Sequence, residues 1–195
     1  MKKFLMLLSV ALLLFLCACS GQPSEQSVDA PVYNGTIEEF CASYNWVEMS
    51  MTKAEIEVEL GQGVANELNQ TVVYTDQEGE TGVILVYYED GTVRGKTLYY
   101  QDIRTIGALM PVSKYGMHDK VKPGMKLAEV DQLMGSTGLE LMRINELMDD
   151  PADYKIYYVY TSPHGIVLEC FMTPDMKVIE VLSGFEPEQQ EQATE

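Results

Sequence analysis

The stretch MTKAEIEVELG at residues 51–61 recurs 74 residues later as MKLAEVDQLMG at residues 125–135. Both copies begin with Met, continue with Ala-Glu and a β-branched residue, and end on a Gly five residues after that residue. Thr52 and Glu55 have the spacing of a capping box at a helix start, and the closing Gly is a typical helix stop. The two copies therefore predict one short helix in each half of an internally repeated chain.

The segments downstream of the two helices also correspond. GVILVYY at residues 82–88 parallels GIVLECF at residues 165–171. Their offset is 83 residues, so the second copy has about nine extra residues, which fall around residues 139–153. Runs rich in β-branched and aromatic residues, separated by turn sequences, predict strands in both copies. These strands are expected at residues 71–76, 82–88, 92–100, 154–161, 165–172 and 177–183.

An earlier short helix is expected in each copy, at about residues 37–45 and 112–119. Strands joined by a single tight turn pair antiparallel. The fold class that follows is α+β, with two tandem units that each place two short helices on one face of a three- or four-stranded antiparallel sheet. We expect the first unit at residues 35–108 and the second at residues 109–184.

The N-terminus indicates export. Two lysines are followed by an almost wholly apolar run at residues 4–16 and by Leu-Cys-Ala-Cys at residues 16–19. This order describes a secretory signal, and the run is shorter than the ~20 residues that cross a bilayer. The Leu-x-Ala-Cys ending resembles the lipobox of bacterial lipoproteins. That resemblance implies a signal peptide at residues 1–18, acylation of Cys19 with chains such as palmitate, and an anchor on the outer side of the cell membrane. An ordinary secretory signal is the alternative.

The two ends of the mature chain and its charge restrict the partners. Residues 19–34 are rich in Ser, Gln, Gly and Pro and predict a flexible tether, and residues 185–195 predict a disordered acidic tail. The mature chain has 30 acidic and 11 basic residues, a formal charge of −19. Such a charge argues against nucleic acid and against a surface that lies flat on anionic lipid. We therefore expect membrane contact through the N-terminal lipid only.

The sequence contains no recognised catalytic motif. His118 and His164 are the only histidines, and they fall in different repeats. The acidic cluster around Asp150 lacks the spacing of a calcium loop. We therefore expect no enzyme, no cofactor and no metal. Cys41 and Cys170 could form a disulfide outside the cytoplasm, although the sequence does not show whether they come close enough.

Tyrosine is concentrated in the predicted strands, which contain nine of the 12 tyrosines. Alternation along the strands assigns Tyr157 and Phe171 to the solvent-facing side of the sheet, and the repeat assigns Tyr74 and Tyr88 to the same side. Tyrosine is enriched in protein interfaces because its side chain is large, rigid and amphipathic. We interpret this side as a protein-binding face; the alternative is that strands simply favour tyrosine.

The repeat resembles a known family. PGMKLAEV at residues 123–130 looks like the signature that opens each unit of the β-lactamase inhibitory proteins, and single units of this kind resemble outer-membrane assembly lipoproteins of the SmpA/OmlA type. EDGTVRGK at residues 89–96 is similar to a hairpin of the inhibitors, although theirs lies in the second unit. The resemblance covers about residues 36–184 and implies a concave, aromatic sheet face, with Tyr99 in the place of a contact residue. The first copy has Ser50 where the signature has Gly, and the cysteine pair within each unit is missing.

The function that follows is non-catalytic binding. We expect a membrane-anchored, extracytoplasmic lipoprotein that binds a protein partner, with inhibition of an envelope enzyme as one form of this activity. An envelope assembly factor is one alternative. A small hydrolase or ligand-sensing domain with an unrecognised site is another, and a deep cleft with clustered ionisable groups would distinguish it from an open apolar face.

Overall fold

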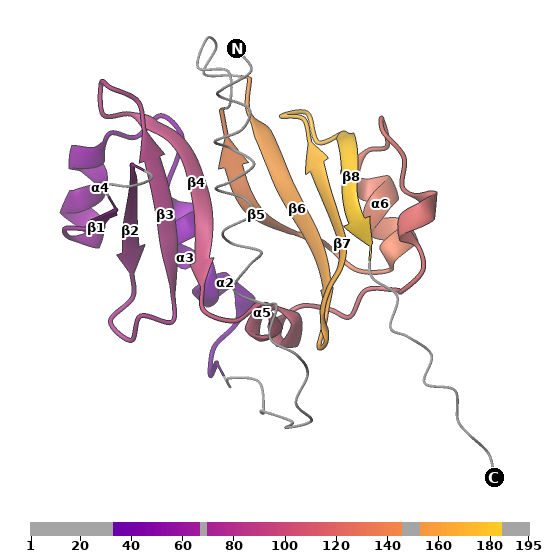
Figure 1. Ribbon diagram of the computed structural model, residues 1–195. Helices are drawn as coiled ribbons and strands as arrows, with labels where there is room; N and C mark the ends of the chain where they lie inside the picture. The colour runs from indigo at the N-terminus through magenta and orange to yellow at the C-terminus, as the bar shows by residue number, and fades with distance from the viewer. Residues whose placement is uncertain (1–32, 67–69, 146–152, 185–195) are drawn as a thin grey trace.

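Eight strands form one antiparallel sheet in which every strand pairs with its neighbours in the sequence. The computed structural model describes residues 33–66, 70–145 and 153–184 (Figure 1). The strands are β1 (Val64–Asn66), β2 (Thr71–Thr75), β3 (Thr81–Tyr87), β4 (Val93–Tyr100), β5 (Leu139–Ile144), β6 (Lys155–Ser162), β7 (Gly165–Met172) and β8 (Val178–Gly184). The helices are α2 (Ile37–Phe40), α3 (Ala42–Trp46), α4 (Lys53–Leu60), α5 (Ile103–Leu109), α6 (Leu127–Met134) and the 3-10 turn η2 (His118–Lys120).

The two repeated helices are present as α4 and α6. The Glu55 carboxylate accepts a hydrogen bond from the Thr52 N–H at 2.8 Å, and the Thr52 hydroxyl accepts one from the Glu55 N–H at 3.4 Å. This reciprocal pair is the capping box that the sequence predicts. Helix α6 ends at Gly135, whose φ of 72° lies in the left-handed region that favours glycine.

Each repeated helix is attached to the sheet in the same way. The Met51 carbonyl accepts a hydrogen bond from the Val93 N–H at 2.9 Å, and the Met125 carbonyl accepts one from the Val178 N–H at 2.8 Å. One isolated bridge, Thr52 to Thr92, accompanies the first contact, and a second, Lys126 to Lys177, accompanies the other. These hydrogen bonds occupy backbone groups at the helix entry and fix each helix against the last hairpin of its half.

The early helices differ between the two halves. The helix expected at residues 37–45 is present as α2 and α3, whereas residues 112–119 contain no α-helix, so that prediction was wrong. Here the Ser113 N–H donates to the Thr161 carbonyl and the Lys114 N–H donates to the Met134 carbonyl. These donors bind distant segments and are unavailable for a helix. Helix α5, which begins after Asp102, was not predicted from the sequence.

The α+β class is confirmed, but the sheet is one continuous structure rather than two separate sheets of three or four strands. Strand β5 lies within the extra residues of the second copy, where no strand was predicted. It pairs with β4 through Gly95–Ile144, Lys96–Arg143 and Thr97–Met142. Without that pairing, both strands would leave a row of backbone donors and acceptors open at the centre of the molecule.

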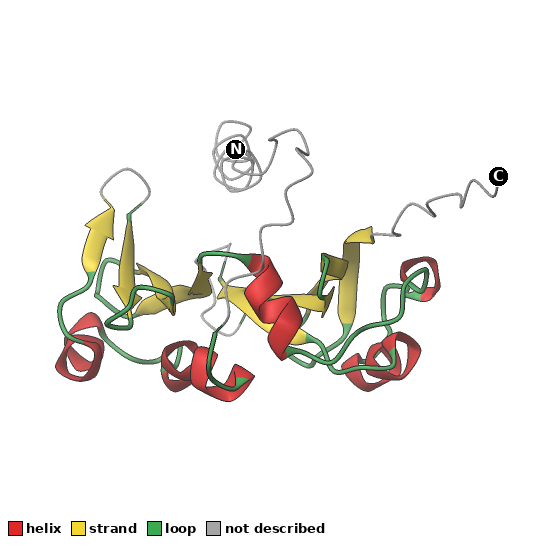
Figure 2. Ribbon diagram, turned by 90° about the horizontal axis from the view of Figure 1, so that it is seen from below, coloured by secondary structure: helices red, strands yellow, loops and turns green. Residues whose placement is uncertain are grey.

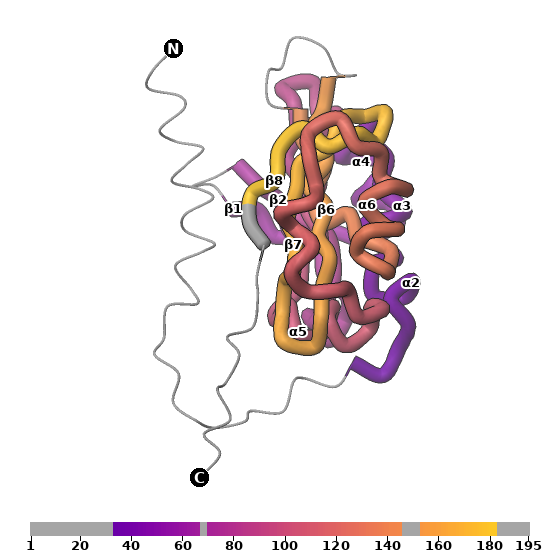
Figure 3. The backbone as a smooth tube through the Cα atoms, turned by 90° about the vertical axis from the view of Figure 1, so that its right-hand side faces the viewer, coloured from indigo at the N-terminus to yellow at the C-terminus, as the bar shows by residue number. Residues whose placement is uncertain are grey.

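The helices gather on one side of the sheet. Figure 3 shows α2, α3, α4 and α6 on the same side. Two core clusters lie beneath them, one built around Phe40, Ile56 and Leu85, the other around Val130, Met134 and Met172. Figure 2 shows that the two ends of the sheet rise away from the helices, so the opposite face is concave.

Helix α5 lies at the lower edge of the sheet in Figure 1 and packs against β6 and β7. Its Gly107 is buried against the Ser162 backbone, where a Cβ would overlap the Ser162 carbonyl oxygen. This contact requires glycine for steric reasons. Helix α5 therefore joins the two halves at the position where the chain passes from β4 to the second repeat.

Candidate functional site

The face of the sheet away from the helices carries a continuous row of side chains across all eight strands. Strand register places one residue of each strand directly opposite the next. At a strand spacing of ~4.8 Å, this row is roughly 34 Å long. We call it the open-face row, and its members are Val64, Val73, Ile84, Thr97, Met142, Tyr157, Phe171 and Glu180.

The open-face row is apolar over most of its length and yet is not buried. All of its members are half-buried or exposed, and Val64 at one end is 75% exposed. The next residues along the same strands, such as Val72, Leu85 and Leu98, point to the helix side and are buried. Apart from α5 at the lower edge, no helix of the described residues covers the row.

Three aromatic residues predicted to bind a partner lie on this open face. Tyr157 and Phe171 are opposite each other in the row, with ring centroids 5.7 Å apart. The Lys155 ammonium lies 5.8 Å from the centre of the Phe171 ring. Tyr99 lies two residues from Thr97 on β4 and faces the same side. Burial raises the pKa of Tyr157, and the Glu169 carboxylate, which accepts a hydrogen bond from the Tyr157 hydroxyl, raises it further.

Tyr74 and Tyr88 do not share this face in the way the repeat predicted. Tyr74 is opposite Val83 on the helix side, is 3% exposed and has its hydroxyl oxygen 3.1 Å from that of Tyr87. Tyr88 follows a β-bulge at the end of β3, and its buried hydroxyl has no hydrogen-bond partner among the described residues. The prediction failed for Tyr74 because its face was transferred from the second copy through the repeat, and a shift of one residue between the copies moves a side chain to the other face.

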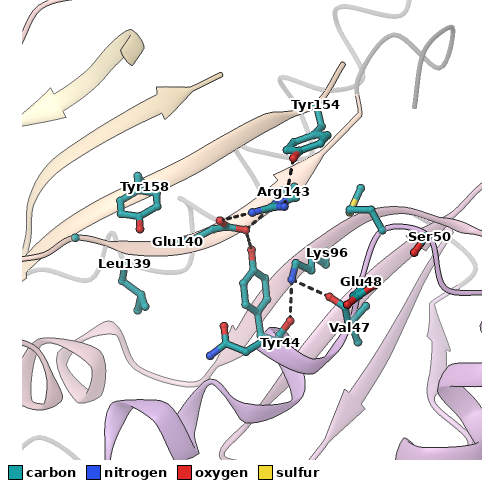
Figure 4. Close-up of a pocket in the computed structure, with 13 residues that line it drawn as sticks. Tyr44, Val47, Glu48, Ser50, Lys96, Leu139, Glu140, Arg143, Tyr154 and Tyr158 are labelled. Carbon is teal, nitrogen blue, oxygen red and sulfur yellow. Dashed lines mark hydrogen bonds and ion pairs between the residues drawn. The ribbon is translucent and has the colours of Figure 1, made fainter. Parts of the chain in front are cut away.

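A second feature is a cleft of about 700 Å³ on the helix side, where the two halves meet (Figure 4). Its floor contains Lys96 and Arg143, which are opposite each other on β4 and β5. The residues that line it come from α3, the loop after it and strands β4 to β6. They are Tyr44, Asn45, Val47, Glu48, Met49, Ser50, Lys96, Gly138, Leu139, Glu140, Arg143, Tyr154 and Tyr158.

Lys96 is a buried cation within this cleft, with 7% of its surface exposed. Its ammonium donates to the carbonyls of Tyr44 and Val47, both at 2.9 Å, and lies 4.2 Å from the centre of the Tyr44 ring. These carbonyls belong to the C-terminal end of α3, which favours a cation. Burial nevertheless lowers the pKa of Lys96 to about 8, with Glu140 opposing the shift and Arg143 adding to it.

Glu140 and Arg143 form the centre of the cleft. The guanidinium donates to both carboxylate oxygens, from Nε at 3.0 Å and from Nη2 at 2.8 Å. The Tyr44 hydroxyl donates to the same carboxylate at 2.7 Å, which joins the first half of the chain to the second. Arg143 also donates to the Tyr154 hydroxyl at 3.4 Å and lies over the Tyr154 ring. Figure 4 shows this network between Tyr158 on one side and Lys96 on the other.

The two histidines do not contribute to the cleft. His118 lies in η2, with its Nε2 3.3 Å from an Asp119 carboxylate oxygen, and His164 is exposed in the turn before β7. Cys41 and Cys170, considered as a possible disulfide, are both free and buried, and they belong to different core clusters. Burial raises the pKa of each thiol to about 12, so neither is a reactive thiolate at neutral pH.

Several predictions fall on residues that the structure does not describe. The signal peptide, Cys19, most of the tether at residues 19–34 and the tail at residues 185–195 lie outside the described ranges. Within those ranges, no group of three metal-binding side chains occurs. Nor is any described helix long and apolar enough to cross a membrane.

Comparisons with known proteins do not assign the chain to a family. No protein-family model matches it, and no curated protein matches it. Among solved structures, 14 chains match. One is a DUF4309 family protein, YjgB, from Bacillus subtilis subsp. subtilis strain 168, with 17% identity over 67% of this chain and 76% of that chain. Its TM-score of 0.28 is too low to support a statement about fold or function. Nothing in these comparisons supports the β-lactamase inhibitory proteins or the SmpA/OmlA-type lipoproteins specifically.

Proposed function

We propose that this protein is a lipid-anchored, extracytoplasmic module that binds a protein partner on the concave face of its sheet and does no chemistry there. The observation that carries the proposal is the open-face row, which is apolar over most of its length, is aromatic at Tyr157 and Phe171, and is covered by no described helix except α5 at its lower edge. Each Å² of apolar surface left in water costs about 25 cal/mol relative to burial. A contiguous uncovered apolar surface of this kind is typical of an interaction site.

The size and shape of the face suit a folded protein. A standard interface buries about 800 Å² per partner, a patch roughly 30 Å across. The open-face row has a comparable length, about 34 Å at normal strand spacing. A concave sheet would accept a protruding loop or hairpin of the partner, and the aromatic pair Tyr157–Phe171 would supply the anchor near one end.

The recurring geometry of the halves supports tandem units within the single sheet. The backbone contact between Met51 and Val93 has its counterpart between Met125 and Val178. We therefore retain, as part of the proposal, two related units at residues 35–108 and 109–184 and a binding mode like that of the β-lactamase inhibitory proteins. Inhibition of an envelope enzyme is the first activity to test, and assembly of envelope proteins is the second.

The anchor and the tether complete the proposal. An acylated Cys19 would hold the chain at the membrane, and residues 20–34, as a flexible chain, would span roughly 20 Å on average. The folded part could then reach a partner that is itself attached to, or close to, the membrane. The formal charge of −19 for the mature chain would keep the sheet off anionic lipid.

The proposal is tested by measuring affinity and melting temperature on the same variants, once a partner is purified. Tyr157→Ala and Phe171→Ala should each weaken binding by about 2 kcal/mol, roughly thirtyfold, if these rings are interface anchors. Val58→Ala is the matched control, because Val58 is 80% exposed on α4. Equal affinities for all three variants would exclude the aromatic pair from the interface. A loss of melting temperature without a loss of affinity would make the rings part of the core.

A further inference from the structure

The cleft between the halves has more hydrogen-bond donors than its own residues use. Arg143 has five N–H donors, of which three serve Glu140 and Tyr154. Lys96 has three donors, of which two bind backbone carbonyls. The Tyr154 hydroxyl accepts from Arg143 and donates to no described residue. The Tyr158 hydroxyl makes no hydrogen bond with any described residue. Among the described residues, five donors of these four side chains therefore have no acceptor in the protein.

The acceptors that directly surround Lys96 and Arg143 are already occupied. Both carboxylate oxygens of Glu140 accept from Arg143, and one also accepts from Tyr44. The carbonyls of Tyr44 and Val47 accept from Lys96. A ligand that pairs with these free donors must therefore bring acceptors.

The charge of the cleft differs from that of the whole chain. Lys96 and Arg143 are cationic and Glu140 and Glu48 are anionic, so the four charged side chains that line the cleft sum to zero in a chain of −17. Glu48 is the exposed member of this set. A carboxylate ligand would bring one negative charge into the cleft, whereas a phosphate monoester would bring about −1.5 to −2 charges at pH 7.

We infer that the cleft is a binding site for a small molecule with a carboxylate group, held by Arg143, Tyr154 and Tyr158. Charge-assisted hydrogen bonds from a guanidinium and phenol hydroxyls suit the two oxygens of a carboxylate. The cleft volume of about 700 Å³ is within the range of ligand pockets. This site is on the helix side of the sheet, whereas the proposed protein-binding face is on the other side, so the two proposals stand separately.

Binding of such a ligand would also connect the two halves. Tyr154 and Tyr158 belong to the second half, while Tyr44 and Lys96 belong to the first. A carboxylate among these groups would add contacts at the junction of β4 and β5, where only three residue pairs are in register. The ligand should therefore raise the melting temperature, because it binds the folded chain alone.

The test is a calorimetric titration of the full-length chain with three probes. N-acetylmuramic acid and N-acetylglucosamine differ by a lactyl ether that bears a carboxylate, and N-acetylalanine has a carboxylate without a sugar ring. We expect both acids to bind and to raise the melting temperature, and N-acetylglucosamine to do neither. The acid with the higher affinity indicates whether the ligand derives from a glycan or from a peptide.

Two variants locate the site. Tyr158→Phe removes an oxygen that has no described partner, so the fold should be unchanged while the affinity for the acids falls about tenfold. Tyr99→Phe makes the same chemical change on the open face and should leave acid binding unchanged. Binding of N-acetylglucosamine as tight as that of N-acetylmuramic acid would overturn the inference. So would the absence of acid binding at millimolar concentration, or equal affinity of Tyr158→Phe and the unmodified protein.

Discussion

Replacing Lys96 by Met should change how the stability of the protein depends on pH. Lys96 keeps its proton up to about pH 10.5 in the unfolded chain, whereas burial lowers its folded pKa to about 8. Between these values the unfolded state binds more protons than the folded state. Stability therefore rises with pH across this window, and the burial penalty is largest below pH 8.

The size of the effect follows from the two pKa values. Each pKa unit corresponds to about 1.4 kcal/mol, so the gap between 10.5 and about 8 sets a ceiling of about 3 kcal/mol. Roughly 2 kcal/mol of it should be realised between pH 7 and pH 10. The groups that face Lys96 are Glu140 and Glu48, which raise its pKa, and Arg143, which lowers it.

The assay is urea unfolding of the unmodified protein and Lys96→Met at pH 7 and pH 10. Other groups titrate in this range, including tyrosines whose folded pKa is raised, but they are common to both proteins and cancel in the difference. The unmodified protein should gain about 2 kcal/mol relative to the variant on going from pH 7 to pH 10. Parallel pH profiles for the two proteins would refute the reasoning, because they would mean that Lys96 keeps an ordinary pKa.

Three further predictions address the junction, the helix contact and the anchor. Tyr44→Phe removes the hydrogen bond to Glu140 and should lower the free energy of unfolding in urea by about 1.5–3 kcal/mol. An unchanged free energy of unfolding would argue against this bond between the halves. Gly107→Ala should destabilise the fold by about 1–3 kcal/mol through overlap with Ser162, and a neutral result would place α5 farther from β6. Cys19→Ala should release the protein from the membrane fraction, and retention of the variant without lipid labelling of the unmodified protein would contradict lipidation.

The sequence predicted the parts of the fold that depend on local chemistry. The capping box at Thr52 and Glu55 located α4, and β-branched runs located six of the strands. Strand β5 was missed because its residues interrupt the repeat and become a strand by pairing with β4 and β6. Helix α5 was missed because it is short and depends on the contact of Gly107 with Ser162.

The candidate sites were less predictable than the fold. The pairing of Tyr157 with Phe171 on one face followed from alternation, but the face of Tyr74 was inferred from the repeat, where a shift of one residue reverses the face. No local sequence motif indicates the cleft, because Tyr44, Lys96 and Glu140 are far apart in the sequence. They meet only through the register of β4 with β5. The available signal was Lys96 itself, a charged residue that shares one face of a predicted strand with Leu98.

The central claim, that the concave sheet face binds a protein partner, is tested most directly by site-specific photo-crosslinking in the native envelope. A photo-reactive residue in place of Thr97, at the centre of the open-face row, is compared with the same residue in place of Val58 on α4. The account predicts one crosslinked protein from position 97 that disappears when Tyr157 is replaced by Ala, and no such product from position 58. Crosslinking of the same protein from position 58 and not from position 97 would contradict it.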